Sequence, residues 1–579
     1  MKINETKNAS KVNSSNKDQY SAEQIKHGHL NHMDGVSYDI KNPVNQLRIV
    51  ASSCFFGEPQ YYHEDKAENT KVRAAVSKVE KDEKRENYLD SVLGGSVSIA
   101  DYRTYSASKL METAIDAALD FDPEATLQEA VRLRNEENFR TTPQVIMVRA
   151  AHHEKVRGTG LLTKYAQNIM KRTDEAAVQL AYQVQVYGKP IPNGLKKAWR
   201  KFLETRTEYD LAKYRMENHH FKTVDVVNLV RAFSPEINQL VKGTLKLSVK
   251  DTWEALISEK GSSKETWTKA VDLMGHMALL RNLRNLHQKG VAHELYLDKL
   301  VSTAKNGKQL PFRYFSAHKT LKEAGVSGNV LDAVEKCLEI SIGELPKFSG
   351  KVMSLCDNSG SAQSTTTSSM GTVRVADIAN LTAVLTGKAS EDGYIGIFGD
   401  ELEVRPVRKN ASVFDQVQEA NKIGHNIGQG TENGVWLFFN KAIKTKEHWD
   451  HVFVYSDMQA GHGGLYGTSP KDYKDYIWKN GDKSGYGERM IDVAKLVKTY
   501  REKVNPNVNV YLVQVAGYRD TLVPEFYDKT YILGGWGDGV LKFAHKMSNP
   551  QNQLEKNANM SEASKTEPVV TVKKKKFKV

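Results

Sequence analysis

The stretch that decides the fold of the C-terminal part of the chain is Val352-Met353-Ser354-Leu355-Cys356-Asp357-Asn358-Ser359-Gly360-Ser361. Its first half is a mostly apolar run that is long enough for a buried strand and too short for a helix. The run ends at Asp357, and amide, hydroxyl and glycine residues follow it. We therefore predict a buried strand that opens into a polar loop.

Three later segments of the chain have the same character as this strand. They are short, apolar and rich in β-branched and aromatic residues, and helical patterns lie between them. Strands that alternate with helices predict a parallel, doubly wound sheet, which binds its ligands at the carboxyl ends of its strands. The expected strands lie at 394–398, 451–455 and 508–515, and the expected helices lie at 375–385, 412–422 and 491–503.

The loop after the first strand carries oxygen ligands of the kind that a hard divalent cation prefers. Asp357, Ser359 and Ser361 form an Asp-x-Ser-x-Ser pattern, Thr431 follows a glycine-rich loop, and Asp457 follows a later strand. Mg2+ takes an octahedron of oxygen ligands and keeps several waters. We expect a divalent cation here, with Mg2+ as the first choice. The alternative is that the hydroxyls only cap the next helix and no ion is bound.

The spacing of these three loops resembles the metal-ion-dependent adhesion site of von Willebrand factor A (vWA) domains. The resemblance implies that the ion is surrounded, directly or through water, by Asp357, Ser359, Ser361, Thr431 and Asp457. In many vWA domains the open coordination position accepts an acidic side chain from a partner protein. An acidic protein ligand is therefore an expectation for this chain.

The N-terminal part of the chain has a helical pattern from about Pro43 to Leu345. Apolar residues recur three and four positions apart, and short polar or Gly/Pro turns separate the segments. Many successive short helices predict a solenoid of helix pairs. The expected helical segments include 107–118, 126–134, 165–187, 194–205, 224–232 and 274–286.

Polar ends flank the two expected domains. Residues 1–35 are rich in Lys, Asn, Ser and Asp, and residues 546–579 end in a run of lysines. Both ends are expected to lack fixed structure. The predicted domains are therefore a helical-repeat domain over 36–345 and an α/β domain over 346–545.

The positive charge of the chain is concentrated in one stretch of the helical part. The net charge is +12, but residues 151–250 alone hold 18 basic and 9 acidic side chains, whereas residues 346–545 hold 23 of each. A polyanion is the natural partner of such a stretch, because each neutralised phosphate releases condensed counterions. The alternative is a charged surface that serves only solubility.

One helix of this stretch is predicted to carry a basic stripe. Lys196, Lys197, Arg200 and Lys201 fall three and four apart in pairs, as neighbours on one helix face do. Such a stripe contacts backbone phosphates and carries little sequence information. The stretch also contains Lys213, Arg215 and Lys222, and its interleaved aromatics Trp199, Tyr214 and Phe221 either stack bases or pack in the core.

An ordered set of segments in the helical part resembles the landmarks of the TROVE module. Together with the vWA-like segment behind them, they make the chain similar to the Ro 60 kDa autoantigen family and its bacterial relatives. The resemblance implies HEAT-like helical repeats that a Rossmann-like vWA domain closes into a ring. The segments are Leu47-Arg48 with Gly57 and Tyr61-Tyr62, then Arg140-Thr141-Thr142-Pro143, Gly194–Ala198, Lys213-Tyr214-Arg215, Leu279–Leu283 and Leu310–Tyr314.

The resemblance implies an RNA-binding scaffold of a ribonucleoprotein rather than an enzyme, and it adds Arg140 to the expected RNA-binding residues. The family binds single-stranded 3′ ends of misfolded or structured noncoding RNA in the ring, and small Y RNAs on its outer basic surface. Bacterial relatives are tethered through a Y RNA to exoribonucleases, which act in RNA quality control or processing. This chain departs from the family at Thr223, where a histidine is common.

Other classes of protein are set aside or kept as alternatives. No apolar run is long enough for a membrane helix, and three cysteines make neither a disulfide framework nor a zinc pattern. The expected molecule is a cytoplasmic monomer without membrane attachment. A protein-interaction scaffold that uses the solenoid and the metal site without RNA is the alternative. A serine hydrolase is disfavoured, because the loop lacks the Gly-x-Ser-x-Gly pattern.

Overall fold

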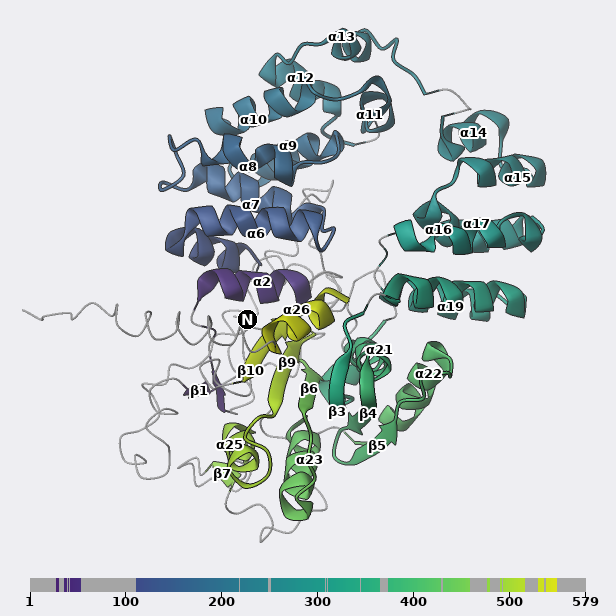
Figure 1. Ribbon diagram of the computed structural model, residues 1–579. Helices are drawn as coiled ribbons and strands as arrows, with labels where there is room; N and C mark the ends of the chain where they lie inside the picture. Colours follow the sequence, from purple (N-terminus) through teal and green to yellow (C-terminus); the bar gives the residue numbers. More distant parts are fainter. Residues whose placement is uncertain are drawn as a thin grey trace, which may run out of the picture.

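The molecule consists of a curved array of helices followed by a doubly wound α/β domain, as the computed structural model shows (Figure 1). The expected basic tail beyond Ser548 and the segments containing Gly57 and Tyr61-Tyr62 lie outside the described residues. The structure describes residues 28–30, 36–38, 40, 42–53, 111–217, 219–247, 251–307, 309, 311–343, 345–364, 373–428, 431–458, 476–478, 490–491, 493–515, 529–535 and 538–548.

Two short strands precede the helical array. β1 (Gly28–Leu30) pairs antiparallel with β2 (Val36–Tyr38), so that Gly28 faces Tyr38. β1 falls within the segment that was expected to lack fixed structure. This strand was not predicted, because its residues show no alternation of apolar and polar side chains.

The helical array runs from residue 43 to residue 342. One helix covers residues 111–121. The others are α2 (Pro43–Ser53), α6 (Pro123–Asn135), α7 (Thr141–His152), α8 (Leu161–Ile169), α9 (Asp174–Val186), α10 (Asn193–Leu203), α11 (Glu208–Lys213), α12 (Thr223–Val230), α13 (Pro235–Val241), α14 (Trp253–Lys260), α15 (Lys264–Leu273), α16 (His276–Gln288), α17 (Leu297–Ser302), α18 (Pro311–Glu323) and α19 (Gly328–Ile342), with 3-10 turns at His293–Leu295 and Ala304–Asn306.

Side-chain caps set where several of these helices begin. The carboxylate of Asp122 accepts the backbone N–H of Ala125 (2.9 Å) in front of Pro123, and Ser263 caps α15 in the same way. These caps satisfy backbone donors that have no partner within the helix. The segment 165–187 was expected as one helical run, but it is divided between α8 and α9, because Met170 adopts an extended conformation.

The α/β domain is built on a six-stranded sheet with the order β10-β9-β6-β3-β4-β5. All neighbouring strands are parallel except β4 and β5. The predicted doubly wound sheet is thus confirmed, but both of its edge strands, the antiparallel β5 and the parallel β10, were missed. The strands are β3 (Phe348–Asp357), β4 (Ser390–Phe398), β5 (Leu402–Pro406), β6 (His451–Ser456), β9 (Asn509–Gln514) and β10 (Thr530–Gly534), with a separate pair of β7 (Ile477–Trp478) and β8 (Met490–Ile491).

Helices cover both faces of this sheet, because successive residues of each strand face opposite sides. In β3, Val352 and Cys356 join the core that contains α21 and α22, whereas Met353 and Leu355 join the core that contains α23 and α25. The helices of the domain are α20 (Gly360–Ser364), α21 (Val375–Lys388), α22 (Val413–Gly424), α23 (Thr431–Thr445), α25 (Val493–Lys503) and α26 (Asp538–Ser548).

The α/β domain contacts both ends of the helical array and so closes the ring of elements seen in Figure 1. At one end, α2 packs on β10 so tightly that a Cβ on Gly534 would lie 2.5 Å from the Ile49 carbonyl oxygen. At the other end, the Glu335 carboxylate of α19 accepts the Ser412 hydroxyl (2.8 Å) and the Val413 backbone N–H (2.6 Å) at the start of α22. The helices α14–α19 also share one hydrophobic core with the sheet.

None of the helices in the described part of the chain combines the length and the apolar character that spanning a membrane requires.

The buried His451 side chain is expected to make stability depend on pH. Its ring lies against Phe348 and its Nδ1 atom is 3.0 Å from the Tyr511 hydroxyl. Burial lowers the pKa of His451 to about 4, aided by nearby His545 and opposed by Asp450. Below pH 6.5 the unfolded chain therefore binds a proton that the folded chain does not. The free energy of unfolding should fall by up to about 3 kcal/mol as the pH drops from 6.5 to 4.

His451→Gln should remove most of this dependence. Urea unfolding of both proteins at several pH values measures the difference, and equal pH dependence in the two would contradict the assignment.

Candidate functional site

The candidate metal loop lies where the strand order of the sheet reverses. From β3 the chain continues to β4 on one side, and β6 then pairs on the other side of β3. The carboxyl ends of β3 and β6 are therefore adjacent, and loops that leave in opposite directions open a crevice at such a point. Asp357 is the last residue of β3, and Ser456 is the last residue of β6.

The structure brings together the three residues of the Asp-x-Ser-x-Ser pattern. Asp357 is fully buried, and its Oδ1 atom accepts the backbone N–H of Ser359 (2.9 Å). Its Oδ2 atom accepts the hydroxyl of Ser456. The Ser359 and Ser361 hydroxyl oxygens lie 3.2 Å apart. A compact set of oxygen atoms therefore surrounds the end of β3.

A second buried carboxylate stands beside this loop. Asp457 follows Ser456 directly and is also buried. Burial raises the pKa of Asp357, and the negative charge of Asp457 raises it further. Two carboxylates that repel each other in a buried place are stabilised when a cation lies between them.

Thr431 is the first residue of α23, but its side chain lies outside the described part of the structure, as do Gln429 and Gly430. The backbone of this helix start lies at the same edge of the sheet. A Cβ on Gly434 would lie 2.0 Å from the Cβ of Phe398, the last residue of β4. The helix that carries Thr431 thus begins at the carboxyl edge where Asp357 ends β3.

The donors at this edge are all oxygen atoms, which fits a hard cation such as Mg2+. Within the described residues there is no group of three or more His, Cys, Asp or Glu side chains that could hold a metal ion. Any ion at this loop would therefore depend on hydroxyl groups beside two carboxylates. Ser456 was not predicted as part of the site, although it ends β6 directly before Asp457.

A layer of amides beneath the loop was also missed. The Asn358 side-chain nitrogen donates to the Cys356 carbonyl (3.1 Å) and to the Asn380 side chain (2.9 Å), and Asn380 donates to Asn421 (2.6 Å). A Cβ on Gly424 would lie 2.0 Å from Asn358 Oδ1. These contacts tie the loop to α21 and α22. An asparagine inside a helical pattern gives no signal for such a role in one sequence.

The predicted basic stripe lies on the outer face of α10. Lys197, Arg200 and Lys201 are exposed and Lys196 is half-buried, whereas Leu195, Ala198, Trp199, Phe202 and Leu203 on the other face are buried. The helix is thus amphipathic, with cations opposite its core face.

Trp199 is a core residue and does not stack bases. It is fully buried, and its indole N–H donates to Gln179 (2.6 Å). Phe221 is half-buried, and the Arg172 guanidinium lies over the Tyr214 ring at 4.3 Å. Thr223 is buried as well, and its hydroxyl donates to the Tyr214 carbonyl.

The predicted RNA-binding cations differ in how far they are already paired. Arg200 pairs with Glu204 (2.9 Å), and Arg215 pairs with Glu217 (2.6 Å) and donates to the Leu245 carbonyl (2.7 Å). The Lys213 ammonium donates to the Tyr209 hydroxyl (3.0 Å). Among the described residues, no ion pair is found for Lys196, Lys197, Lys201 or Lys222. Arg215 therefore has a structural role, and the lysines of α10 are the cations free for an anion.

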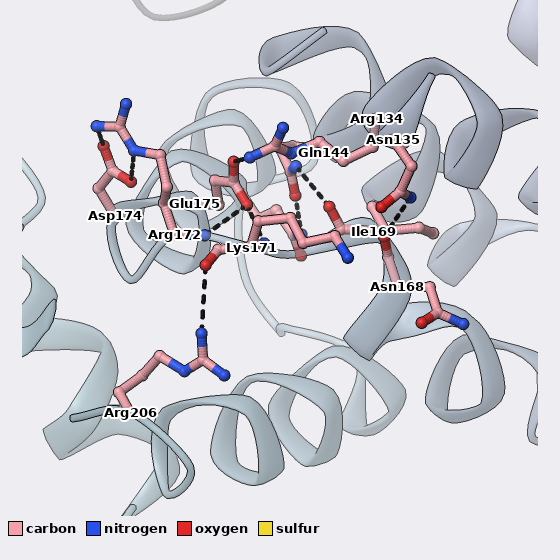
Figure 2. A network of polar contacts seen from close by, with 11 residues as sticks. Arg134, Asn135, Gln144, Asn168, Ile169, Lys171, Arg172, Asp174, Glu175 and Arg206 are labelled. Atoms are coloured by element: carbon pink, nitrogen blue, oxygen red, sulfur yellow. Dashed lines mark hydrogen bonds and ion pairs between the residues drawn. The ribbon is translucent and has the colours of Figure 1, made fainter. Parts of the chain in front are cut away.

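Arg140 lies in a second basic cluster, at the turns that join α6 to α7 and α8 to α9. Burial lowers the pKa of its guanidinium, and the charge of Arg172 lowers it further. Figure 2 shows the network that holds this region, in which Arg134 pairs with Glu175 (2.7 Å) and Arg206 donates to the Lys171 carbonyl (3.2 Å). Lys171, Arg172 and Arg206 were not singled out from the sequence, because no helical spacing links these loop residues.

Comparison with known proteins agrees with this architecture. Residues 230–341 match the family model of the TROVE domain. The crystal structure of the Deinococcus radiodurans Ro (RSR) protein superposes with a TM-score of 0.51 at 13% identity, over 75% of this chain and 93% of that chain. Telomerase protein component 1 is 36% identical in Rattus norvegicus and 34% identical in Mus musculus, each over 84 residues. These residues make up 13% of this chain and only 3% of each relative's length.

The second half of the helical array therefore contains a segment that matches the TROVE domain, in a molecule that combines a helical array with an α/β domain. The chain has the fold of the Ro protein, as the resemblance to the Ro 60 kDa family predicted.

Asp357→Asn is expected to raise the stability of the metal-free protein and to abolish metal binding. Asparagine keeps an acceptor for the Ser359 N–H and removes the repulsion from Asp457. The metal-free melting temperature should rise by about 2–4 °C, which corresponds to about 1 kcal/mol. Stabilisation by added Mg2+ or Mn2+ should disappear. Thermal unfolding with and without metal measures both effects, and an unchanged response to metal would contradict the site.

Proposed function

We propose that this chain is a noncatalytic RNA-binding scaffold of a ribonucleoprotein. The observation that carries the proposal is the outer face of α10, where Lys197 and Lys201 are exposed and have no carboxylate partner among the described residues. Phosphate groups are the ligands that such a stripe fits. The match to the TROVE domain and the fold shared with the Ro protein support the same class of function.

The proposed ligand is structured or misfolded noncoding RNA with a free single-stranded 3′ end. Because phosphate contacts dominate, binding depends on shape and ends rather than on base sequence. A Y-like small RNA on the basic outer surface, with an exoribonuclease held through that RNA, belongs to the same proposal. In this proposal the protein is a cytoplasmic monomer, and it acts in RNA quality control or RNA processing.

We further propose that the α/β domain is a vWA domain that holds Mg2+ through Asp357, Ser359, Ser361, Thr431 and Asp457. The buried pair of carboxylates and the facing serine hydroxyls support this assignment. When bound, the ion would supply a Lewis-acidic position for an acidic side chain of a partner protein. The amides of Asn358 and Asn380 would hold the loop in place around it.

The metal loop also favours a second candidate function, a protein-interaction scaffold without RNA. It predicts that no RNA copurifies with the protein and that substitutions on α10 have little effect. Sequencing of RNA that copurifies with the intact chain separates the two candidates.

Replacing Lys196, Lys197, Arg200 and Lys201 together with alanine should weaken RNA binding for every sequence tested. The lost phosphate contacts should also make the slope of log Kd against log salt shallower by about 1 per contact removed. Equilibrium binding of a labelled hairpin RNA with a single-stranded 3′ tail, measured from low to high salt, gives both quantities.

The matched control is Lys409→Ala with Lys441→Ala, two exposed lysines of the α/β domain. The control should lose little affinity. Equal losses in the two variants, or none in the first, would refute the assignment of α10.

A further inference from the structure

Phe233 is the most exposed large hydrophobic residue in the described part of the chain, with 72% of its surface accessible. It lies in the turn between α12 and α13, within the part of the chain that matches the TROVE domain. The aromatics that the sequence singled out are less available, because Trp199 is buried and Phe221 is half-buried. The Phe233 ring therefore faces solvent and is not part of the hydrophobic core.

The backbone of Phe233 is fixed although its ring is exposed. Arg231 ends α12 in a left-handed conformation (φ 53°), and its neighbour Ala232 donates to the Val227 carbonyl (3.1 Å). On the other side, the Ser234 hydroxyl accepts the Ile237 N–H (3.1 Å) and begins α13. A rigid backbone on both sides means that little conformational entropy is lost when a ligand contacts the ring.

One carboxylate joins Phe233 to the basic stripe. Glu204 Oε1 accepts both the Phe233 backbone N–H (3.2 Å) and the Arg200 Nε–H (2.9 Å). The hydrogen bond from Arg200 lowers the pKa of Glu204, and the Phe233 N–H adds to this, so the carboxylate stays ionised near neutral pH. Positions 197, 200, 201 and 204 follow one face of α10. The aromatic ring therefore stands at the C-terminal end of the row of cations.

Cations in a row with an exposed aromatic ring beside them are typical of surfaces that bind single-stranded nucleic acid. Phosphates contact the cations, and an unpaired base stacks on the ring. A base inside a duplex has no free face to offer to such a ring. We propose that Phe233 stacks an unpaired base of RNA whose backbone lies on α10, and so makes this surface prefer single-stranded segments. This inference rests on the proposed function and adds a residue that selects the form of the RNA.

Phe121 provides a matched control. Its ring is 60% exposed, at the end of the helix over residues 111–121, and Asp120 and Asp122 flank it. It is thus an exposed phenylalanine that lies outside the row of cations on α10. Loss of general surface hydrophobicity would affect both positions, whereas base stacking would affect only Phe233.

The test compares Phe233→Ala, Phe233→Trp and Phe121→Ala in the full chain. The probes are a duplex RNA with a 3′ tail of uridines and the same duplex with blunt ends. Phe233→Ala should weaken binding of the tailed probe by about 5- to 100-fold. It should leave the blunt probe and the salt slope unchanged. Phe233→Trp should keep the affinity, and its indole fluorescence should be quenched by the tailed probe. Phe121→Ala should behave like the parent chain.

Equal affinity of the parent and Phe233→Ala for the tailed probe would overturn the inference while leaving RNA binding by α10 intact. Equal losses for tailed and blunt probes would also overturn it, because stacking on an unpaired base cannot explain them. If the parent chain binds neither probe, the proposed function fails, and this inference fails with it. Matching melting temperatures for the variants show that the fold is preserved.

Discussion

The packing of the α/β domain against both ends of the helical array is the constraint on which the rest of the structure depends. At β10 the contact leaves no room for a side chain at Gly534, and at α22 the Glu335 carboxylate caps the helix from the opposite end of the array. The helices α14–α19 share a core with the sheet, whereas the first half of the array has a core of its own. The basic helix α10 belongs to this first half, which contacts the α/β domain through α2.

This arrangement separates the acidic groups of the α/β domain from the basic groups of the helical array. The carboxylates and hydroxyls gather at the edge of the sheet where the strand order reverses, and burial makes the pair Asp357 and Asp457 costly without a cation. The free cations lie on α10, where apolar residues on the opposite face fix the helix and leave its lysines in water. The proposed RNA surface and the proposed metal site therefore lie on different domains of the molecule.

The sequence predicted what local patterns determine. Apolar runs located β3, β4, β6 and β9, the helical spacing located α10, and the stretch ending at Asp357 located the loop at the end of β3. Features that depend on contacts between residues far apart in the chain could not be predicted from the sequence. The role of Arg215 depends on the Leu245 carbonyl, the burial of Trp199 depends on Gln179, and Phe233 depends on Glu204 from another helix. The edge strand β5 was missed although Leu402 and Val404 alternate with charged residues, which is the pattern of a half-buried strand. The division between α8 and α9 was missed because Met170 belongs to both apolar patterns.

The central claim is that RNA contacts the face of the ring formed by α10 and the turn before α13. Ultraviolet crosslinking of the intact protein to a hairpin RNA with a 4-thiouridine 3′ tail, followed by mass spectrometry of the crosslinked peptides, tests it most directly. The account predicts crosslinks within residues 193–204 and 231–234. Crosslinks confined to the α/β domain, or an even scatter over the surface, would contradict it.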